Sequence, residues 1–518
     1  MTRKVNRNSF VIQNNVVVEP EVVMKCDGIT WDRVVDVVVV GLGAAGSAAA
    51  IEAYDNGAEV LVLEKDRVGG GNTRLSGGTL RRIADIDGAT QYYAAVNDET
   101  VSLAMNRRLV EGIASCHAWF EEKCDAMFVE NTKILFPPAP HVIWDFLPGA
   151  EGMGGRSQFA VADPAENERN GGHRMFLTLM QGITRRNIEI LYNMGGRRLL
   201  QNSSGEVVGI LAQSPDGKED LAIKTRKGVI LCCGGFHKNK EMQINYLSMP
   251  YLEQGCTFGD GDGITMTQEI GAKMWHMTGV SCGISYLVEG YDVPIGIGIR
   301  TPHYFYVDQT GKRFLNETGM DVHAMAFDFT ATNAEKMSYP RMPSYLIFDE
   351  HIRTSGPMLG QCPGKILDDP TFSWSADNKV EIEKGWIKMA YSVADLGRRL
   401  GYNEGVLEKA VGEYNHAALT GYDPDFRRDA FSMKALDQPP YYAIEVWPAL
   451  LNTQGGPQRD EEARVLNVDN KPIPRLFSAG ELGSMLNKFY PGGTNITEAI
   501  VFGRIAGENA AKLPPLEE

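Results

Sequence analysis

A short segment near the N-terminus constrains the fold more than any other part of this sequence. Residues 34–40 form a β-branched run that ends in the turn Gly41-Leu42-Gly43-Ala44-Ala45-Gly46, and alanines then follow at helical spacing. A second short apolar run, residues 59–63, ends at Glu64. The order of strand, glycine turn, helix, strand and acid predicts a βαβ unit within an α/β fold.

The residue types in this unit are those that bind a dinucleotide. Gly41 permits the tight turn, Gly43 lets a pyrophosphate approach the backbone, and Gly46 lets the helix pack closely on the strand. The pyrophosphate would lie at the N-terminus of the helix that begins near Ala44. Glu64 is placed to accept hydrogen bonds from a ribose diol, so a 2′-phosphate, and therefore NADP, is disfavoured.

A second glycine-rich segment follows directly after the acid. It reads Gly69-Gly70-Gly71-Asn72-Thr73, and then Ser76-Gly77-Gly78. Backbone N–H groups and small hydroxyls in such a segment can line an extended cofactor and its isoalloxazine ring, which an NAD-only dehydrogenase does not need. The pattern favours FAD over NAD; the alternative is a flexible surface loop.

The charge balance limits the class of partner. The chain has 518 residues and a formal net charge of −15, from 51 Lys and Arg against 66 Asp and Glu. At roughly 100–200 residues per domain, this length allows about two to four domains. A nucleic-acid partner is disfavoured because the chain offers no basic surface that would release counterions.

The sequence also predicts a cytoplasmic protein without a metal site. Its eight cysteines form neither a CxxC pair nor a regular framework, which indicates reduced thiols. No uncharged apolar run reaches about 18 residues, so we expect no transmembrane segment. The N-terminal residues lack the apolar centre of an export signal.

The middle of the chain predicts mixed α and β elements and an inserted domain. Further strands are predicted at 189–192 and 207–211, around the turn Ser203-Ser204-Gly205, and at 228–231, and a final helix at 497–511. Residues 290–435 contain more aromatics and prolines, with a long helical charge pattern near 395–415. This change of character predicts the second domain.

Several segments together resemble one family of flavoproteins. The βαβ unit, GGGNTRLSGG, the strand at 228–236, the run Gly259-Asp260-Gly261-Asp262-Gly263, and the C-terminal SAGEL and GGTNITEAIVFGRIAGENAA stand in the order typical of fumarate reductase and 3-ketosteroid dehydrogenase-type FAD flavoproteins. The resemblance implies a Rossmann-like FAD domain of glutathione-reductase type, residues 31–287 and 440–518. It also implies an inserted α+β capping domain, residues 288–439, and an N-terminal arm, residues 1–30.

The resemblance further implies how FAD is held. Some relatives attach the flavin to a histidine in the segment that matches Asn72-Thr73; none of the nine histidines lies there, so we expect noncovalent FAD. The expected cofactor-binding residues are Gly41, Gly43, Ala44, Ala45, Gly46, Glu64, Lys65, Gly70, Gly71, Asn72, Thr73, Ser76, Gly77, Gly78, Val208, Cys233, Gly234, Gly235, Gly261, Asp262, Gly480, Glu481, Gly493, Asn495 and Ile496.

The dicarboxylate reductases of this family carry three features that this chain lacks. They have an arginine after a GxRFxNE segment, a Glu-x-x-Arg pattern before it, and a His and Arg pair in the C-terminal loop. Here the GKRFLNE segment is present without the following arginine, Gly298-Ile299-Arg300-Thr301 lacks the glutamate, and residues 485–493 contain neither histidine nor arginine. Because carboxylate clamps use bidentate guanidinium groups, a fumarate-like or succinate-like substrate is disfavoured.

The C-terminal loop instead resembles the 3-ketosteroid dehydrogenase branch. Tyr490 is followed by Pro-Gly-Gly, and in that branch a tyrosine hydroxyl and a glycine N–H polarise the substrate ketone. Two neutral donors suit a reaction that places enolate character on a carbonyl oxygen. Relatives have slightly longer loops, so Gly492 and Gly493 are both candidates for the N–H, and Gly493 is the expected one. The alternative is that Tyr490 only packs beside the flavin.

The proton carrier is less clearly indicated. Ketosteroid dehydrogenases place a tyrosine shortly after RFxNE, where this chain has Asp321 and His323. Tyr304 and Tyr306, which alternate on a predicted strand, are rival candidates. The missing tyrosine leaves a smaller cyclic ketone open as the substrate.

The favoured interpretation is an FAD enzyme that introduces or reduces a C=C bond conjugated to a ring ketone, with a 3-oxosteroid as substrate. An electron donor or acceptor is required, and its identity and the direction of the reaction stay open. The alternatives are a reductase of an unsaturated carboxylate, which requires arginines in the pocket, and a flavin-binding redox sensor without turnover.

Overall fold

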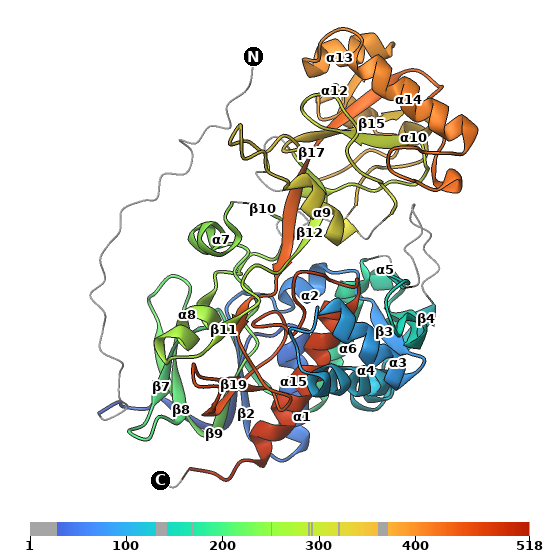
Figure 1. The fold of residues 1–518 in the computed structure, drawn as a ribbon. Coiled ribbons are helices and arrows are strands. Elements are labelled where there is room, and N and C mark those ends of the chain that lie inside the picture. The colour runs from blue at the N-terminus through green and yellow to red at the C-terminus, as the bar shows by residue number, and fades with distance from the viewer. Residues whose placement is uncertain are drawn as a thin grey trace.

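The computed structural model describes residues 28–516, apart from 131–141, 168, 250, 289–290, 292–293, 320–321 and 361–370. Figure 1 shows two lobes: a lower lobe that contains both ends of the described chain, and an upper lobe formed by the middle of the sequence. Two long strands, β12 (Val280–Leu287) and β17 (Tyr441–Thr453), connect them. The predicted N-terminal arm, residues 1–30, falls almost entirely outside the described residues.

The lower lobe is built on a largely parallel sheet. Its parallel strands follow the order β20 (Pro472–Ser478), β9 (Asp220–Leu231), β1 (Arg33–Val40), β2 (Val60–Glu64) and β6 (Glu189–Tyr192). Antiparallel strands β19 (Arg464–Leu466), β7 (Gly195–Gln201) and β8 (Val207–Gln213) extend it. Val37 to Val40 are buried, which explains the uninterrupted valines of β1.

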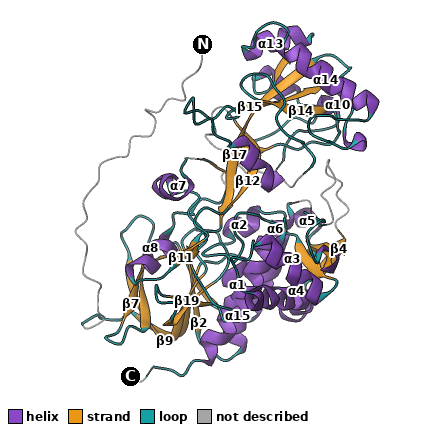
Figure 2. Cartoon of the chain, in the orientation of Figure 1, coloured by secondary structure: helices purple, strands orange, loops and turns teal. Residues whose placement is uncertain are grey.

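Helices cover one side of this sheet, as Figure 2 shows. They are α1 (Ala44–Asp55), α3 (Ile86–Val96), α4 (Leu103–Cys124), α6 (Gly171–Arg185) and α15 (Thr494–Lys512). Helices α1 and α15 approach closely because their interface consists of small residues. A Cβ atom added at Gly503 would lie 2.4 Å from the Ala45 carbonyl oxygen. The two ends of the chain are thereby packed into one hydrophobic core.

Smaller elements complete the lower lobe. A three-stranded sheet has the order β3 (Leu80–Ile83), β5 (Met153–Ala160) and β4 (Met127–Glu130), and β11 (Met274–Trp275) pairs with β18 (Gly456–Pro457). The short helices are α2 (Gly71–Leu75), α5 (Pro164–Asn167), α7 (Lys240–Leu247) and α8 (Asp262–Glu269). No helix of the described residues is both long and apolar enough to cross a lipid bilayer.

The upper lobe is a second sheet with helices. Its strand order is β13 (Pro294–Gly296), β12, β17, β15 (Ser344–Asp349) and β14 (Tyr304–Val307), and β10 (Leu252–Glu253) and β16 (Lys388–Ala390) also pair with β17. Its helices are α9 (Val322–Phe329), α10 (Glu350–Thr354), α12 (Lys379–Glu383), α13 (Val393–Leu400) and α14 (Val406–Thr420). Successive residues of β14 enter different cores, with Tyr304 and Tyr306 in one and Phe305 and Val307 in the other.

The fold confirms the α/β prediction and corrects two details. The predicted strands at 189–192 and 207–211 are not partners, because β7 intervenes and forms the hairpin with β8 around Ser203-Ser204-Gly205, whereas β6 pairs with β2. The helical pattern near 395–415 is two helices, because α13 ends at Gly401, which has a positive φ of 83°. The domain boundaries at 287/288 and 439/440 stay a proposal; β12 ends at the first and β17 begins just after the second.

Candidate active site

A cavity of about 700 Å³ lies between the two lobes. One end of it, which we call the nucleotide end, is lined by the C-terminal ends of β1 and β2 and the N-terminus of α1. The other end, which we call the ketone end, is lined by residues 490–496, by β12 and by upper-lobe residues including Tyr304, Tyr306 and His323. Both ends of the chain and its middle therefore contribute to one site.

The nucleotide end exposes backbone N–H groups. The turn after β1 requires glycine at position 41, where φ is +103° and an added Cβ would lie 2.4 Å from the Cys232 carbonyl oxygen. Gly43 is the N-cap of α1 and supplies no side-chain cap, so the first turn of the helix opens onto the cavity. An anion such as a pyrophosphate is stabilised at such a helix terminus.

Glu64 lies beside this turn at the end of β2. Its carboxylate accepts hydrogen bonds from the Leu42 N–H at 2.9 Å and the Asp66 N–H at 2.8 Å. Burial raises the pKa of Glu64, against the effect of these two donors. A ribose diol that reached Glu64 would meet a carboxylate already oriented by the backbone.

The second glycine-rich segment lines the cavity next to the first. Thr73 accepts a hydrogen bond on Oγ1 from the Ala44 N–H at 2.9 Å, which joins this segment to the start of α1. Lys65 is held by Asp260 and Asp262, at 2.7 and 2.8 Å from Nζ. The contact with Ala44 excludes the alternative of an unattached surface loop.

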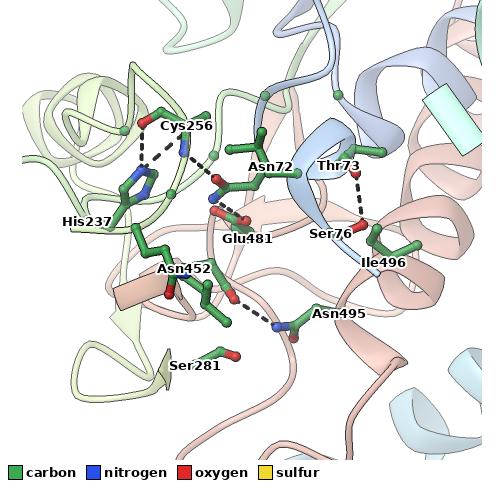
Figure 3. Close-up of a pocket in the computed structure, with 18 of the residues that line it drawn as sticks. Asn72, Thr73, Ser76, His237, Cys256, Ser281, Asn452, Glu481, Asn495 and Ile496 are labelled. Carbon is green, nitrogen blue, oxygen red and sulfur yellow. Dashed lines mark hydrogen bonds between the residues drawn. The ribbon is translucent and has the colours of Figure 1, made fainter. Parts of the chain in front are cut away.

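A buried polar network crosses the cavity wall, as Figure 3 shows. The Asn72 amide donates to Glu481 Oε1 at 2.8 Å and accepts from the Cys256 N–H at 2.7 Å. Glu481 Oε2 is buried, and the Gly235 backbone lies beside this carboxylate. Burial raises the pKa of Glu481 to about 7, and the hydrogen bonds from the Asn72 amide and the Gly235 N–H oppose this shift. Burial also lowers the pKa of His237, which lies next to Cys256, to about 4.

The structure places most of the expected cofactor residues around the cavity. Those that line it are Gly41, Gly43, Ala44, Ala45, Glu64, Lys65, Gly71, Asn72, Thr73, Ser76, Gly77, Gly78, Cys233, Gly234, Asp262, Gly480, Glu481, Gly493, Asn495 and Ile496. Gly46, Gly70, Gly235 and Gly261 are absent from the lining; an added Cβ at Gly46 would lie 1.8 Å from the Gly41 carbonyl oxygen, so Gly46 acts through packing.

Val208 also does not line the cavity, contrary to the expectation from sequence. It is buried in β8, whereas the neighbouring strand β7 begins with Gly195 and Gly196, which do line it. The apolar run at 207–211 therefore lies on the strand of the hairpin that does not line the cavity. Gly195 and Gly196 are adjacent glycines, and no other feature of the sequence marks them as cavity residues.

At the ketone end, Tyr490 and Gly493 are in direct contact. The Gly493 N–H donates to Tyr490 Oη at 2.6 Å, and Gly493 is the N-cap of α15. The buried guanidinium of Arg81 contacts the Gly492 carbonyl oxygen at 2.5 Å, which fixes the loop. Of the two glycines left open by the sequence, the structure therefore brings Gly493 N–H to the tyrosine.

His323, one of the predicted proton carriers, contacts this pair through Tyr490. Its ring packs edge-to-face on the Tyr490 ring, with 4.9 Å between centroids. Its Nδ1 atom lies 3.0 Å from Ser281 Oγ and 2.9 Å from the Cys282 carbonyl oxygen. Asp321 lies outside the described residues.

The tyrosine candidates Tyr304 and Tyr306 line the cavity from β14. Both phenols are buried, and burial raises their pKa well above that of a free tyrosine. The strand is held by a buried ion pair in which Arg428 Nη1 lies 2.9 Å from Glu317 Oε2 and 2.8 Å from the Tyr304 carbonyl oxygen. Such phenols are poor bases because their ionised form is strongly disfavoured.

Two arginines line the cavity. Arg156, on β5, belongs to none of the sequence motifs, whereas Arg300, between β13 and β14, lies in the segment that lacks the glutamate of the Glu-x-x-Arg pattern. Arg300 donates to the Pro357 carbonyl oxygen. The motif positions alone therefore do not predict Arg156 as a cavity residue.

The residues of the nucleotide end fit FAD. The open helix terminus suits a pyrophosphate, Glu64 suits a ribose, and the buried Glu481 carboxylate on the cavity wall would accept a hydrogen bond from a polar cofactor atom. These features, in a cavity under a second lobe, define a flavoprotein oxidoreductase.

The chain belongs to the family of FAD-binding domains, which its sequence matches over residues 36–496. Fumarate reductase (cytochrome) from Shewanella frigidimarina is 30% identical over 491 residues, which cover 92% of this chain and 77% of that protein. The 3-oxosteroid 1-dehydrogenase of Mycobacterium tuberculosis is 26% identical over 383 residues, covering 69% of this chain and 66% of that protein.

A solved structure shares the fold of the whole chain. It is 3-ketosteroid delta1-dehydrogenase from Sterolibacterium denitrificans in complex with 1,4-androstadiene-3,17-dione, with a TM-score of 0.79 at 22% identity, covering 92% of this chain and 99% of that one. The protein is accordingly an FAD-dependent oxidoreductase that acts on carbon–carbon double bonds.

Proposed function

We propose that this enzyme introduces or reduces the C=C bond next to a ring ketone, with a 3-oxosteroid as the favoured substrate. The contact between Tyr490 Oη and Gly493 N–H at the ketone end is the observation that carries this proposal. Because the Gly493 N–H is used by the Tyr490 oxygen, the neutral phenol O–H is the donor that we assign to a ketone oxygen, which gains negative charge in the transition state.

The two donors act in series. Gly493 N–H donates to the Tyr490 oxygen, and a phenol that accepts one hydrogen bond becomes a stronger donor through its own proton. The N-terminal end of α15 adds a favourable positive potential at the same place. Tyr490 is therefore the residue that would hold the ketone oxygen, and Gly493 supports it.

We assign proton transfer at the carbon next to the ketone to His323. It contacts Tyr490, and an imidazole exchanges protons readily near neutral pH. Tyr304 is the weaker candidate because burial raises the pKa of its phenol. When bound, FAD would supply the hydride acceptor or donor for the neighbouring carbon, and it would be held noncovalently because no histidine stands at Asn72-Thr73.

The upper-lobe wall of the cavity supports an apolar substrate body. Ile284, Ile297, Ile299, Met325 and Leu359 line the cavity there. A steroid or another fused-ring ketone would bury apolar surface against these side chains. The ligand in the structural neighbour, 1,4-androstadiene-3,17-dione, is a molecule of this kind.

A reductase of an unsaturated carboxylate is the second candidate. The 30% identity to a fumarate reductase favours it, and Arg156 and Arg300 supply cations in the cavity lining. It competes with the ketone proposal because a carboxylate would require a guanidinium group beside the reacting bond.

Anaerobic mixing of the FAD-loaded protein with each substrate class separates the two candidates. The oxidised protein is mixed with a saturated or 4-ene 3-oxosteroid, and the dithionite-reduced protein with the unsaturated steroid or with fumarate, while flavin absorbance is followed. We expect steroid-dependent bleaching or reoxidation. Reoxidation by fumarate alone would show that the ketone proposal is wrong.

A further inference from the structure

The side of His323 that faces β12 contains two hydrogen-bond acceptors. Nδ1 lies 2.9 Å from the Cys282 carbonyl oxygen, and a carbonyl oxygen can only accept. Nδ1 must therefore bear the hydrogen. Ser281 Oγ, 3.0 Å from the same nitrogen, lies within reach of the same N–H.

We propose that Ser281 and the Cys282 carbonyl fix His323 as its Nδ1–H tautomer, so that Nε2 is the nitrogen that exchanges a proton with the substrate. In this proposal, which rests on the proposed function, Ser281 is a positioning residue for the reaction. Neither the family motifs nor the sequence analysis pointed to it.

The pairing of β12 with β17 is irregular beside His323. Strand β12 pairs with β17 through Ser281 and Asn452 and then through Cys282 and Leu450, so the register shifts between Ser281 and Cys282. Residue 451 of β17 is the extra residue, and Leu451 also lines the cavity. Bulges of this kind redirect side chains and interrupt strand pairing, and they are common beside active sites.

The burial of Ser281 makes its orientation specific. Ser281 is 1% exposed, and both it and His323 line the cavity. In an imidazole, Nδ1 and Nε2 lie on different edges of the ring, so holding Nδ1 against β12 directs Nε2 away from that strand. An Nε2 with a lone pair is the form that can act as a base.

Proton transfer at the carbon next to the ketone involves no change of oxidation state. The C–H bond next to the ketone breaks, its electron pair remains on the substrate as an enolate whose oxygen is bound by Tyr490, and the proton moves to Nε2. In the reverse direction, Nε2–H returns the proton to carbon. Hydride transfer at the neighbouring carbon is a separate step.

Nitrogen NMR of the FAD-loaded protein labelled with ¹⁵N-histidine tests the tautomer directly. At alkaline pH, where histidine side chains are neutral, we expect the His323 signals to show a protonated Nδ1 and an unprotonated Nε2, with His323→Asn used to assign them. A protonated Nε2 in the wild-type protein would overturn the proposal.

Exchange of the substrate proton tests Ser281. The dithionite-reduced protein is incubated with a saturated 3-oxosteroid in D₂O, where flavin reduction is impossible and proton exchange next to the ketone is the step observed. A positioned acid or base contributes ~10²–10⁴ in rate, and we expect Ser281→Ala to slow exchange about tenfold. The variant should also shift the His323 Nδ1 signal, because Nδ1 loses one of its two contacts, while the Cys282 carbonyl keeps the hydrogen on Nδ1. Ser281→Thr, which keeps the hydroxyl, should restore both readouts.

A matched control comes from the same strand. Ser285 also lines the cavity, but its Oγ donates to Gln254 at 2.8 Å and not to a histidine. Ser285→Ala should leave the His323 nitrogen signals unchanged. If Ser281→Ala changes neither the His323 Nδ1 signal nor the exchange rate, Ser281 is not a positioning residue. If no ketone reacts while His323 is still the Nδ1–H tautomer, the proposed function fails and the tautomer assignment stands.

Discussion

The two ends of the cavity bind by different means. At the nucleotide end, the groups that face the cavity are largely backbone N–H groups and glycines held by close packing, as at Gly41 and Gly43. At the ketone end they are side chains, Tyr490, His323 and Ser281, from segments distant in sequence. A substitution that disturbs the backbone at the nucleotide end should lower both the stability of the fold and the binding of the cofactor. A substitution of a side chain at the ketone end should lower the reaction rate and leave the fold intact. The two ends should therefore respond to mutation in opposite ways.

The largest effect is expected from Gly46→Ala at the nucleotide end. Its Cβ would lie 1.8 Å from the Gly41 carbonyl oxygen, so the turn and helix α1 must separate. We expect a loss of about 4 kcal/mol or more of unfolding free energy, together with loss of bound FAD, measured by thermal unfolding and flavin content.

Gly57→Ala is the control for that experiment. Gly57 has a φ of +83°, but an added Cβ would have no atom within 4 Å. Only backbone strain is expected, at about 1–2 kcal/mol, with FAD retained. Equal losses in the two variants would show that close packing at Gly46 is not what holds the nucleotide end together.

Glu481→Gln should change the pH dependence of stability. Burial raises the pKa of Glu481 from 4.5 to about 7, so between these values the folded flavin-free protein binds more protons than the unfolded chain. Its unfolding free energy should therefore fall as the pH rises from 4.5 to 7, by about 3 kcal/mol at most at 1.36 kcal/mol per pH unit.

The neutral amide removes this dependence. In denaturant unfolding of the flavin-free proteins, the unfolding free energy of the variant should equal that of the wild-type protein near pH 4.5 and should be higher above pH 7. A difference between the two proteins that is constant with pH would contradict the assignment of Glu481 as the titrating group.

The smallest effect is expected for the partly exposed ion pairs of Lys65 at the nucleotide end. The side chain of Lys65 is 26% exposed, and its partners Asp260 and Asp262 are 38% and 39% exposed. Ion pairs with this exposure contribute less than about 1 kcal/mol, so Lys65→Met should lower the free energy of unfolding by no more than that. A larger loss of unfolding free energy in a denaturant titration would mean that these ion pairs, and not the backbone turn, stabilise this end.

The same contrast explains what could be predicted from sequence. The nucleotide end follows from local patterns, because the turn at Gly41, helix α1 and Glu64 lie within one short segment of chain. The ketone end depends on contacts between β12, α9 and the loop before α15, which no local pattern records. Ser281 and the cavity arginine Arg156 were missed for that reason.

Tyr490→Phe, compared with Tyr93→Phe, is the most direct test of the proposed chemistry. Tyr93 also contacts the start of α15, where its hydroxyl lies 3.0 Å from Thr494 Oγ1, but it is a core residue. The measurement is the rate of anaerobic flavin bleaching by a 3-oxosteroid. We expect both variants to retain FAD, Tyr490→Phe to slow bleaching by about 10²–10³ as for loss of one oxyanion donor, and Tyr93→Phe to bleach at nearly the wild-type rate. An unchanged rate in Tyr490→Phe would contradict the account.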